Sequence, residues 1–187
     1  SRIKISATHL LSLINELLLY ARVHAGSESV RLEQFVAKGV VDDALAFVAP
    51  TAAERQLTLR AEPVDPTLML RTDPGKLRQL LLNLLANAVK FTSRGEVVVR
   101  VSEQGDQVVF EVRDTGIGID PEDLPHIFDP FWQVEQTTTR KIGGSGLGLS
   151  VTQRLARLLG GDVSVQSTPY VGSTFRITLP KSPAIPA

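Results

Sequence analysis

The chain has 187 residues, 43% of them hydrophobic, so it is long enough to bury one full core with a small appendage. Its 20 basic and 20 acidic residues cancel, which argues against binding to nucleic acid or to an anionic membrane surface. The absence of cysteine excludes a disulfide scaffold, cysteine-ligated zinc and thiol catalysis, and it fits a cytoplasmic location. No apolar run approaches the roughly 20 residues that cross a bilayer, so any membrane anchor is expected elsewhere in a full-length protein.

The first 26 residues predict a long amphipathic helix followed by a turn. Apolar residues recur at alternating spacings of four and three from Ile3 to Ala21, which is the heptad pattern of a helix that packs against a partner helix. Gly26 ends this helix. Beyond it, period-two stretches predict strands over residues 30–36, 56–61 and 68–71, with a helix over 40–55.

The most apolar stretch is LRQLLLNLLANAVKFT, residues 77–92, which indicates a largely buried helix. Asp73 is its expected N-cap and Pro74 lies in its first turn. The segments VVVRVSE and QVVFEVRD follow and flank a turn centred on Gly105, which predicts a hairpin. A helix over 147–159 and a second hairpin, 162–167 with 174–179, complete the pattern.

This element order defines the fold class. Five or six strands and three helices in mixed order, with two hairpins, exclude an all-parallel doubly wound sheet. We therefore expect an α+β fold, a two-layer α/β sandwich in which three helices cover a mixed sheet of about five strands. Residues 1–26 form a separate helix, 27–180 the main domain, and 181–187, with two prolines, a tail or linker.

Asn83, Asn87 and Lys90 lie on one side of the apolar helix, at i, i+4 and i+7. One interpretation is an ordinary solvated stripe. The other is a site in which amide oxygens ligate Mg²⁺ and the lysine binds phosphate, since Mg²⁺ prefers oxygen ligands and shares substrate phosphates.

Two glycine clusters offer a second line of evidence. The first, DTGIGID (114–120), directly follows a strand, so Asp114 is either a buried acceptor for an exocyclic amine or part of a tight turn. The second, GGSGLGL (143–149), opens a helix whose N-terminal N–H groups favour an anion. Neither the P-loop nor the dinucleotide-binding pattern fits it.

The polar stretch between these clusters, residues 133–142, carries Arg140 and Lys141 just before the second cluster. It is either a lid over a phosphate site or an exposed loop. The aromatic segment Phe128–Trp132 either anchors the base of that lid or forms a minor core.

The order NLLANAVKFT, DTGIGI, IFDPF and GGSGLGLS resembles the four successive motifs of the ATP-binding catalytic domain of sensor histidine kinases. That domain has the Bergerat fold, shared with a heat-shock chaperone, type II topoisomerases and mismatch-repair ATPases. The N-terminal HLLSLINELLLYARVHAG resembles the second helix of the family's dimerisation and phosphoacceptor domain. The resemblance implies a domain that binds Mg²⁺-ATP and transfers its γ-phosphate to a histidine.

The resemblance also implies a role for each matching residue. Asn87 ligates Mg²⁺, and Asn83 helps to position the metal and the phosphates. Asp114 accepts the adenine amino group. The implied catalytic residues are Asn83, Lys90, Arg140 and Lys141. The further nucleotide contacts that it implies are Phe91, Gly116, Gly118, Ile119, Phe131, Gly144, Ser145, Gly146, Leu147 and Gly148.

The partners that the resemblance implies are the phosphoacceptor helix of the chain's own dimerisation domain and the receiver domain of a response regulator. A homodimer is expected for the full-length protein, and this fragment is expected to contact neither nucleic acid nor membrane. The family's phosphoacceptor motif is absent, and His9, His24 and His126 lack sequence neighbours that would prepare a nucleophile. The fragment is therefore expected to bind Mg²⁺-ATP without phosphorylating itself.

Two rival functions remain open. One is an ATP-hydrolysing clamp of the same superfamily, which the amide at Asn83 disfavours because an amide cannot act as a general base. The other is a non-catalytic ATP-binding module that regulates a partner.

Overall fold

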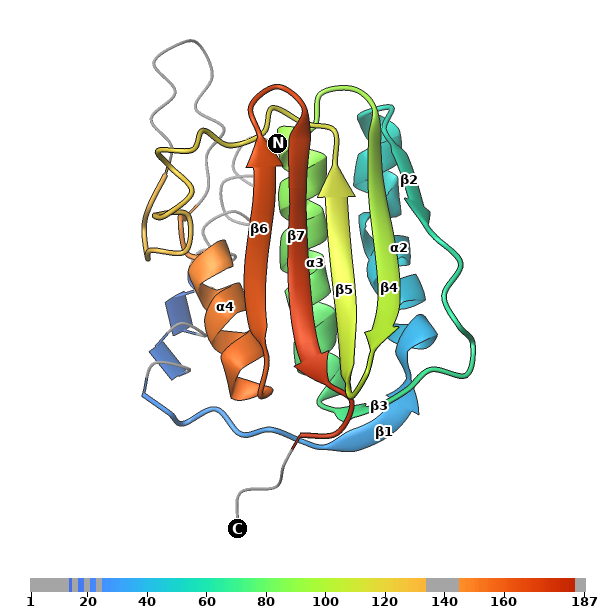
Figure 1. Ribbon diagram of the computed structural model, residues 1–187. Coiled ribbons are helices and arrows are strands. Elements are labelled where there is room, and N and C mark those ends of the chain that lie inside the picture. The colour runs from blue at the N-terminus through green and yellow to red at the C-terminus, as the bar shows by residue number, and fades with distance from the viewer. Residues whose placement is uncertain (1–13, 15–16, 19–20, 23–24, 134–144, 184–187) are drawn as a thin grey trace.

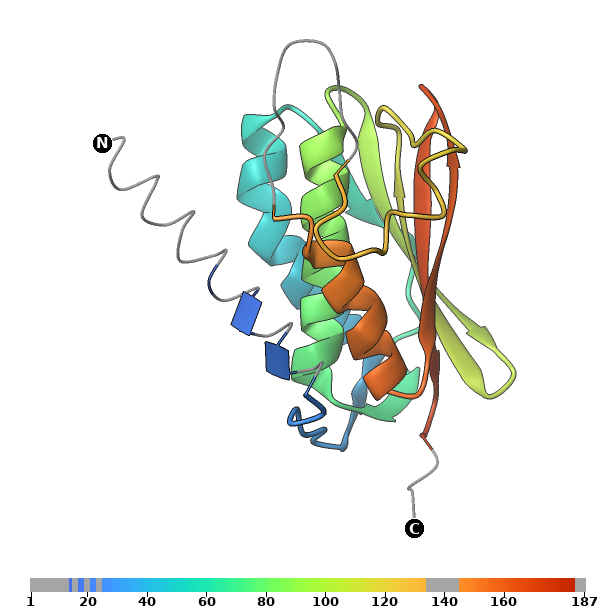
Figure 2. The ribbon, with the colours of Figure 1, turned by 90° about the vertical axis from the view of Figure 1, so that its left-hand side faces the viewer.

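A five-stranded sheet with helices packed against one face dominates the computed structural model (Figure 1 and Figure 2). The structure describes residues 14, 17, 18, 21, 22, 25–133 and 145–183. In chain order its elements are β1 (Glu33–Val36), α2 (Ala37–Glu54), β2 (Thr58–Ala61), β3 (Met69–Thr72), α3 (Pro74–Phe91), β4 (Glu96–Gln104), β5 (Gln107–Asp114), α4 (Gly148–Leu158), β6 (Asp162–Thr168) and β7 (Gly172–Pro180).

The large sheet has the strand order β2-β4-β5-β7-β6. β2 runs parallel to β4, and the other three pairings are antiparallel, so the expected mixed sheet is confirmed. Strands β1 and β3 pair separately as a short antiparallel ribbon. This ribbon raises the strand count of the described residues above the expected five or six.

Helix α3 lies behind the middle of the sheet and supplies much of the core (Figure 1). Asp73 caps it as expected, since its Oδ1 accepts a hydrogen bond from the Lys76 amide at 3.0 Å and Pro74 is the first helical residue. The side chains of Leu80, Leu81 and Leu84 are fully buried. They belong to one hydrophobic cluster with inward-facing residues of β5 and β7. Burial of each such leucine stabilises the fold by about 1.5–3 kcal/mol.

The other predicted elements are close to their expected positions. α2 begins at Ala37, three residues before the expected start. Ala37 is fully buried, so the apolar face of the helix starts one turn earlier than Val40. The hairpin turn between β4 and β5 contains Gly105 at a φ of +64°, as a two-residue hairpin loop requires. Most of the predicted N-terminal helix lies outside the described residues, and within it residues 14, 17, 18, 21 and 22 are helical and exposed.

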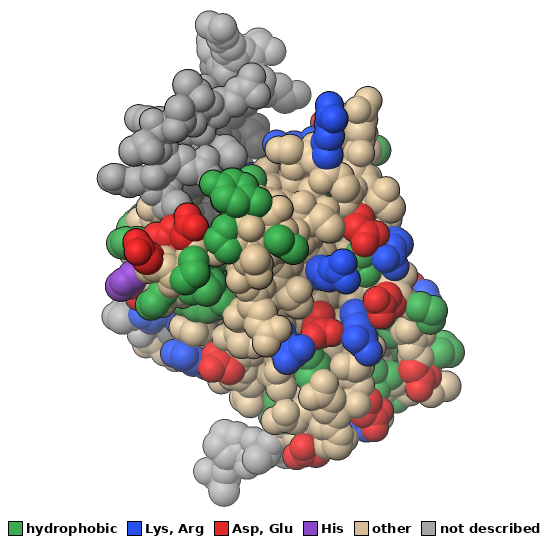
Figure 3. Space-filling model, turned by 45° about the horizontal axis from the view of Figure 1, so that its top comes forward, with side chains coloured by type: hydrophobic (Ala, Val, Ile, Leu, Met, Phe, Trp, Pro, Cys, Tyr) green, Lys and Arg blue, Asp and Glu red, His purple; other side chains and the backbone are tan. Residues whose placement is uncertain are grey.

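The face of the sheet opposite the helices carries charges of both signs (Figure 3). Arg176 pairs there with Glu111, and Arg60 pairs with Glu96 across neighbouring strands. Glu111 is largely shielded from solvent, whereas the Arg60–Glu96 pair is more exposed and contributes little stability. None of the described helices combines the length and apolar character that a membrane span requires.

Candidate functional site

The predicted site residues that the structure describes come from α3, the end of β5, the loop that follows it and the start of α4, toward the upper end of the sheet in Figure 1. There the C-terminal end of α3 lies at the same end of the sheet as the end of β5 and the turn between β6 and β7. Asn83, Asn87 and Lys90 are each half-buried on α3. They are therefore neither sealed in the core nor part of a fully solvated stripe.

A backbone hydrogen bond joins α3 to the first glycine cluster. The Ile117 amide donates to the Phe91 carbonyl at 3.2 Å. A Cβ at Gly116 would lie 2.5 Å from the same carbonyl oxygen, so any side chain at this position would separate the two segments. Helix α3, which carries Asn83 and Asn87 and is called the asparagine helix below, is thus held to the DTGIG segment by main-chain contacts.

Asp114 ends β5 as a buried carboxyl group that is only 6% exposed. Its Oδ1 accepts a hydrogen bond from the Gly116 amide at 2.8 Å. Burial raises the pKa of Asp114 above its usual value, and the backbone amides of Gly116 and Ser173 partly offset this by stabilising the charged form. The carboxyl group is thereby fixed in orientation, as a selective acceptor must be.

The rest of the first cluster is tied to the β6–β7 turn. Gly118 has a φ of +69°, and a Cβ there would lie 2.1 Å from the Thr168 carbonyl oxygen. The Ile119 amide donates to Ser167 Oγ at 2.9 Å, and the Tyr170 amide donates to the Ile117 carbonyl at 2.7 Å. The loop therefore has a fixed path between α3 and the β6–β7 turn.

The aromatic segment is divided between core and surface. Phe128 packs against the hydrophobic core, whereas Phe131 is 61% exposed and has a φ of +66°. The Phe131 amide donates to the Gly146 carbonyl at 3.0 Å, which joins this segment to the second glycine cluster. Gly146 has no room for a side chain, because its Cβ would lie 2.7 Å from the Phe131 carbonyl carbon.

Helix α4 begins beside this junction without a side-chain cap from Leu147, its N-cap residue. Ser145 Oγ accepts the Leu147 amide at 3.0 Å, and the space where a Gly148 Cβ would project is open. The N–H groups of the first turn of α4 and its positive dipole end are therefore suited to an anion.

Two residues that sequence reasoning missed brace the asparagine helix. Asn83 Nδ2 donates to Thr152 Oγ1 of α4 at 3.3 Å. The Arg55 guanidinium, just after α2, donates to the Lys90 carbonyl at 2.8 Å and to the Val89 carbonyl, where it offsets the negative end of the α3 dipole. Neither contact has a local sequence pattern, because each joins residues more than 30 positions apart.

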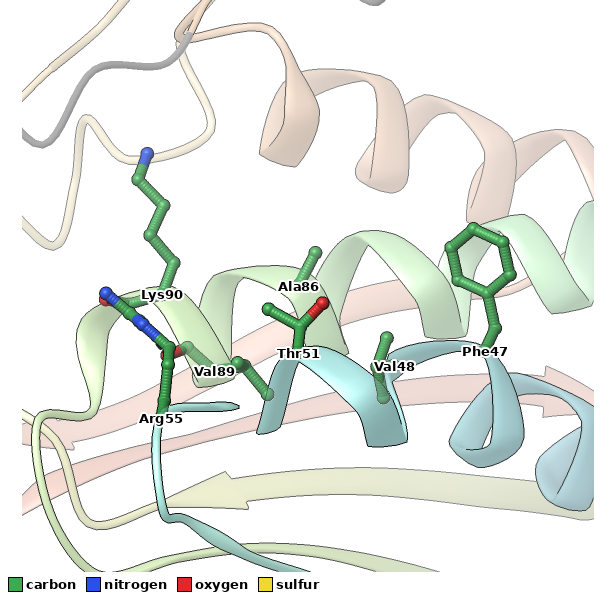
Figure 4. Close-up of a pocket in the computed structure, with 7 residues that line it drawn as sticks. All are labelled: Phe47, Val48, Thr51, Arg55, Ala86, Val89 and Lys90. Carbon is green, nitrogen blue, oxygen red and sulfur yellow. Dashed lines mark hydrogen bonds between the residues drawn. The ribbon is translucent and has the colours of Figure 1, made fainter. Parts of the chain in front are cut away.

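A cavity of about 320 Å³ lies between α2 and α3, with Phe47 and Lys90 at its two ends (Figure 4). Its other lining residues are Val48, Thr51, Arg55, Ala86 and Val89. Lys90 is the one residue of the predicted site among them. The Lys90 ammonium lies 4.7 Å from the centroid of the Phe91 ring, a cation–π distance.

Three predicted site residues, Arg140, Lys141 and Gly144, fall in residues 134–144, outside the described part of the chain. The described residues bring together no group of three His, Asp or Glu side chains that would hold a metal. A metal here would need amide oxygens, and the side chain of Asn87 and the Oδ1 of Asn83 make no hydrogen bond within the described residues. The donor set therefore fits a hard cation that also shares ligands with a phosphate.

The chain is similar to known ATPases and histidine kinases. The family of histidine kinase-, DNA gyrase B- and HSP90-like ATPases matches residues 72–183. The hybrid signal transduction histidine kinase B of Dictyostelium discoideum is 37% identical over 185 residues, which is 95% of this chain and 9% of that protein. The circadian input-output histidine kinase CikA of Synechococcus elongatus is 38% identical over 183 residues, 96% of this chain and 24% of that protein. The chain thus spans a quarter or less of these relatives.

The fold also matches solved structures of histidine kinases. Full-length ShkA in complex with AMPPNP superposes with a TM-score of 0.84 at 33% identity, over 96% of this chain and 37% of that one. The catalytic domain of the histidine kinase ThkA, in a nucleotide-free form, matches with a TM-score of 0.71 at 20% identity, over 82% of this chain and 99% of that one. This second likeness concerns the fold alone.

Proposed function

From the premise that this chain belongs to the family of histidine kinase-, DNA gyrase B- and HSP90-like ATPases, we propose that it is the ATP-binding catalytic domain of a sensor histidine kinase. The observation that carries the proposal is the hydrogen bond between the Ile117 amide and the Phe91 carbonyl. It holds the oxygen and ammonium groups of α3 beside the buried carboxyl of Asp114. Nucleotide binding needs both kinds of group within the length of one ATP molecule.

Asp114 accepts the adenine amino group in this proposal. Its buried carboxyl, oriented by the Gly116 amide, supports the assignment. Guanine presents a carbonyl oxygen at the corresponding position, which a carboxylate repels, so the domain selects ATP over GTP. Gly116, Gly118 and Ile119 shape this end of the site.

Asn87 would ligate Mg²⁺ through its side-chain oxygen, and Asn83 would help to position the metal and the phosphates; neither side-chain oxygen has a protein partner among the described residues. When bound, Mg²⁺ neutralises the charge that develops on the phosphate oxygens. Lys90 adds a cation beside them. Ser145, Gly146, Leu147 and Gly148 offer backbone N–H groups at the start of α4.

Three further assignments fall in residues 134–144, outside the described part of the chain. We assign the terminal phosphate to Arg140 or Lys141 and a backbone contact to Gly144, on the strength of the motif order alone. Phe91 and Phe131 lie at the edges of the nucleotide in this arrangement.

The chemistry at Asn83 separates this proposal from an ATP-hydrolysing clamp. An amide cannot take a proton from water, so bound ATP should persist until an external nucleophile arrives. A histidine on the phosphoacceptor helix of the dimerisation domain is that nucleophile. We further infer that the full-length protein is a cytoplasmic-facing homodimer that passes its phosphate to a receiver domain.

The test is phosphoryl transfer to a phosphoacceptor helix supplied as a separate polypeptide. The chain with radiolabelled Mg²⁺-ATP should give no acid-labile label by itself, and the added helix should acquire label slowly, since the tether is missing. His126 is the necessary control. The structure corrects the view that it lacks an acidic neighbour, because its Nδ1 lies 2.9 Å from Asp129 Oδ2. Label that persists on the chain by itself and vanishes in His126→Gln would overturn the assignment.

A further inference from the structure

The hydroxyl group of Thr152 links α4 to the asparagine helix from a fully buried position. Its Oγ1 donates to the Gly148 carbonyl, one turn earlier in α4, at 2.7 Å. The same oxygen accepts from Asn83 Nδ2 at 3.3 Å. Thr152 thus contacts a residue of the proposed metal site but lies outside the four motifs, the last of which ends at Ser150.

The donor–acceptor count fixes which end of the Asn83 amide faces Thr152. A threonine hydroxyl has one hydrogen and two lone pairs. Because that hydrogen is committed to the Gly148 carbonyl, the oxygen can only accept a second hydrogen bond. Asn83 must therefore turn its NH₂ group, and not its carbonyl oxygen, toward α4.

The amide oxygen is consequently directed away from α4. The two heteroatoms of an amide lie on opposite sides of Cγ, and Asn83 Oδ1 accepts no hydrogen bond from the described residues. Without Thr152, the NH₂ and oxygen of this side chain could exchange places by rotation about χ2. A site that faced the NH₂ group would repel a cation.

We propose that Thr152 is a positioning residue that fixes the polarity of the Asn83 amide, so that its oxygen faces the Mg²⁺–phosphate site. This inference rests on the proposed function. It goes beyond ATP binding itself, because it requires the Thr152 hydroxyl to increase the affinity for ATP in the presence of Mg²⁺ and not in its absence. A hydroxyl that merely packs α4 against α3 would affect binding equally with and without metal.

The experiment compares Thr152→Val, which removes the hydroxyl at nearly constant volume, with Thr152→Ser, which keeps it. ATP dissociation constants are measured by calorimetry in excess Mg²⁺ and in EDTA. Thr152→Val should weaken binding about three- to tenfold in Mg²⁺, the range of one lost hydrogen bond, and leave binding in EDTA unchanged. Thr152→Ser should retain the wild-type values. Thr152→Ala serves the same comparison should the valine variant not fold.

Ser150→Ala is the matched control. Ser150 is a buried hydroxyl on the same helix that donates to the Leu147 carbonyl at 2.8 Å and makes no hydrogen bond to α3. It should not change the metal dependence. In an Asn83→Ala background, Thr152→Val should cause no further loss, because the amide that it orients is gone.

An NMR measurement without nucleotide separates this inference from the proposed function. The side-chain NH₂ protons of Asn83 should exchange slowly in the wild type and rapidly in Thr152→Val. If exchange speeds up while Mg²⁺-ATP affinity stays at the wild-type value, the positioning role is refuted and ATP binding stands. Equal exchange in both proteins also refutes it. A wild-type chain that does not bind Mg²⁺-ATP overturns the proposed function and this inference together.

Discussion

Asp114→Asn is the sharpest test of base selection. The Oδ1 of the carboxyl group accepts a hydrogen bond from the Gly116 amide, and the Ser173 amide also stabilises the charged form. Asparagine offers one oxygen, and its NH₂ group must then face either a protein N–H or the adenine amine. A lost hydrogen bond to a charged acceptor costs about 1.5–3 kcal/mol, which weakens ATP binding roughly ten- to hundredfold.

The assay is calorimetric titration of ATP and GTP into the wild type, Asp114→Asn and the control Asp120→Asn. Asp120 is an exposed aspartate of the same loop, so its substitution should change neither affinity by more than about twofold. The wild type should bind ATP far more tightly than GTP, and Asp114→Asn should reduce that preference. Equal affinity of the wild type for the two nucleotides would refute the reasoning.

The same variant has a pH signature. The folded-state pKa of Asp114 is raised above its ordinary 3.8, chiefly by burial. Its favourable contribution to stability is therefore fully present below pH 3.8 and is lost as the pH rises through the raised pKa. In Asp114→Asn the free energy of unfolding, from urea titrations, should fall less over that interval. An identical pH profile for variant and wild type would show that Asp114 is not desolvated.

Three further predictions concern the metal, the terminal phosphate and an exposed turn. Asn87→Ala should abolish the Mg²⁺ dependence of ATP binding, while the circular dichroism spectrum stays unchanged because alanine favours the helix. If Mg²⁺-ATP binds to the variant with wild-type affinity, the polar side of α3 is only a solvated face. Alanine at both Arg140 and Lys141 should narrow the ratio of ATP to ADP affinity in calorimetry, because only ATP has the third phosphate, and an unchanged ratio would make these residues part of an ordinary loop. Tyr170 has a φ of +61°, a left-handed backbone conformation that strains any residue but glycine, and its side chain is 92% exposed. Tyr170→Gly should therefore raise the free energy of unfolding by about 0.5–1 kcal/mol. A decrease would show that this backbone conformation is not strained.

Local signals account for the elements that the sequence predicts well. Asp73 and Pro74 mark the start of α3 because capping depends on residues within one turn. Gly105 marks a hairpin because the turn needs a positive φ, which is +64° in the structure. The motif order likewise indicates the family, since each motif is contiguous in the chain.

Pairings between distant segments could not be predicted in this way. β1 and β3 pair although α2 and β2 lie between them in the chain, and the sequence of neither strand indicates which strand it pairs with. The contact between Asn83 and Thr152 spans 69 residues. It exists because α4 packs against α3, a consequence of tertiary structure that a polar stripe on one helix cannot reveal.

The hydrogen bond between the Phe131 amide and the Gly146 carbonyl bears on how such a domain can diversify. It fixes the two ends of the intervening segment, residues 132–145, at a constant separation on the body of the domain. With the ends fixed, each doubling of the segment's length adds only about 0.6 kcal/mol of closure entropy. A change in the length of this segment should therefore cost the fold little, whereas Arg140, Lys141, Gly144 and Ser145 within it carry the proposed phosphate contacts. The length of the segment, and not its proposed phosphate contacts, is thus the property that evolution or a protein engineer can vary at little cost to stability.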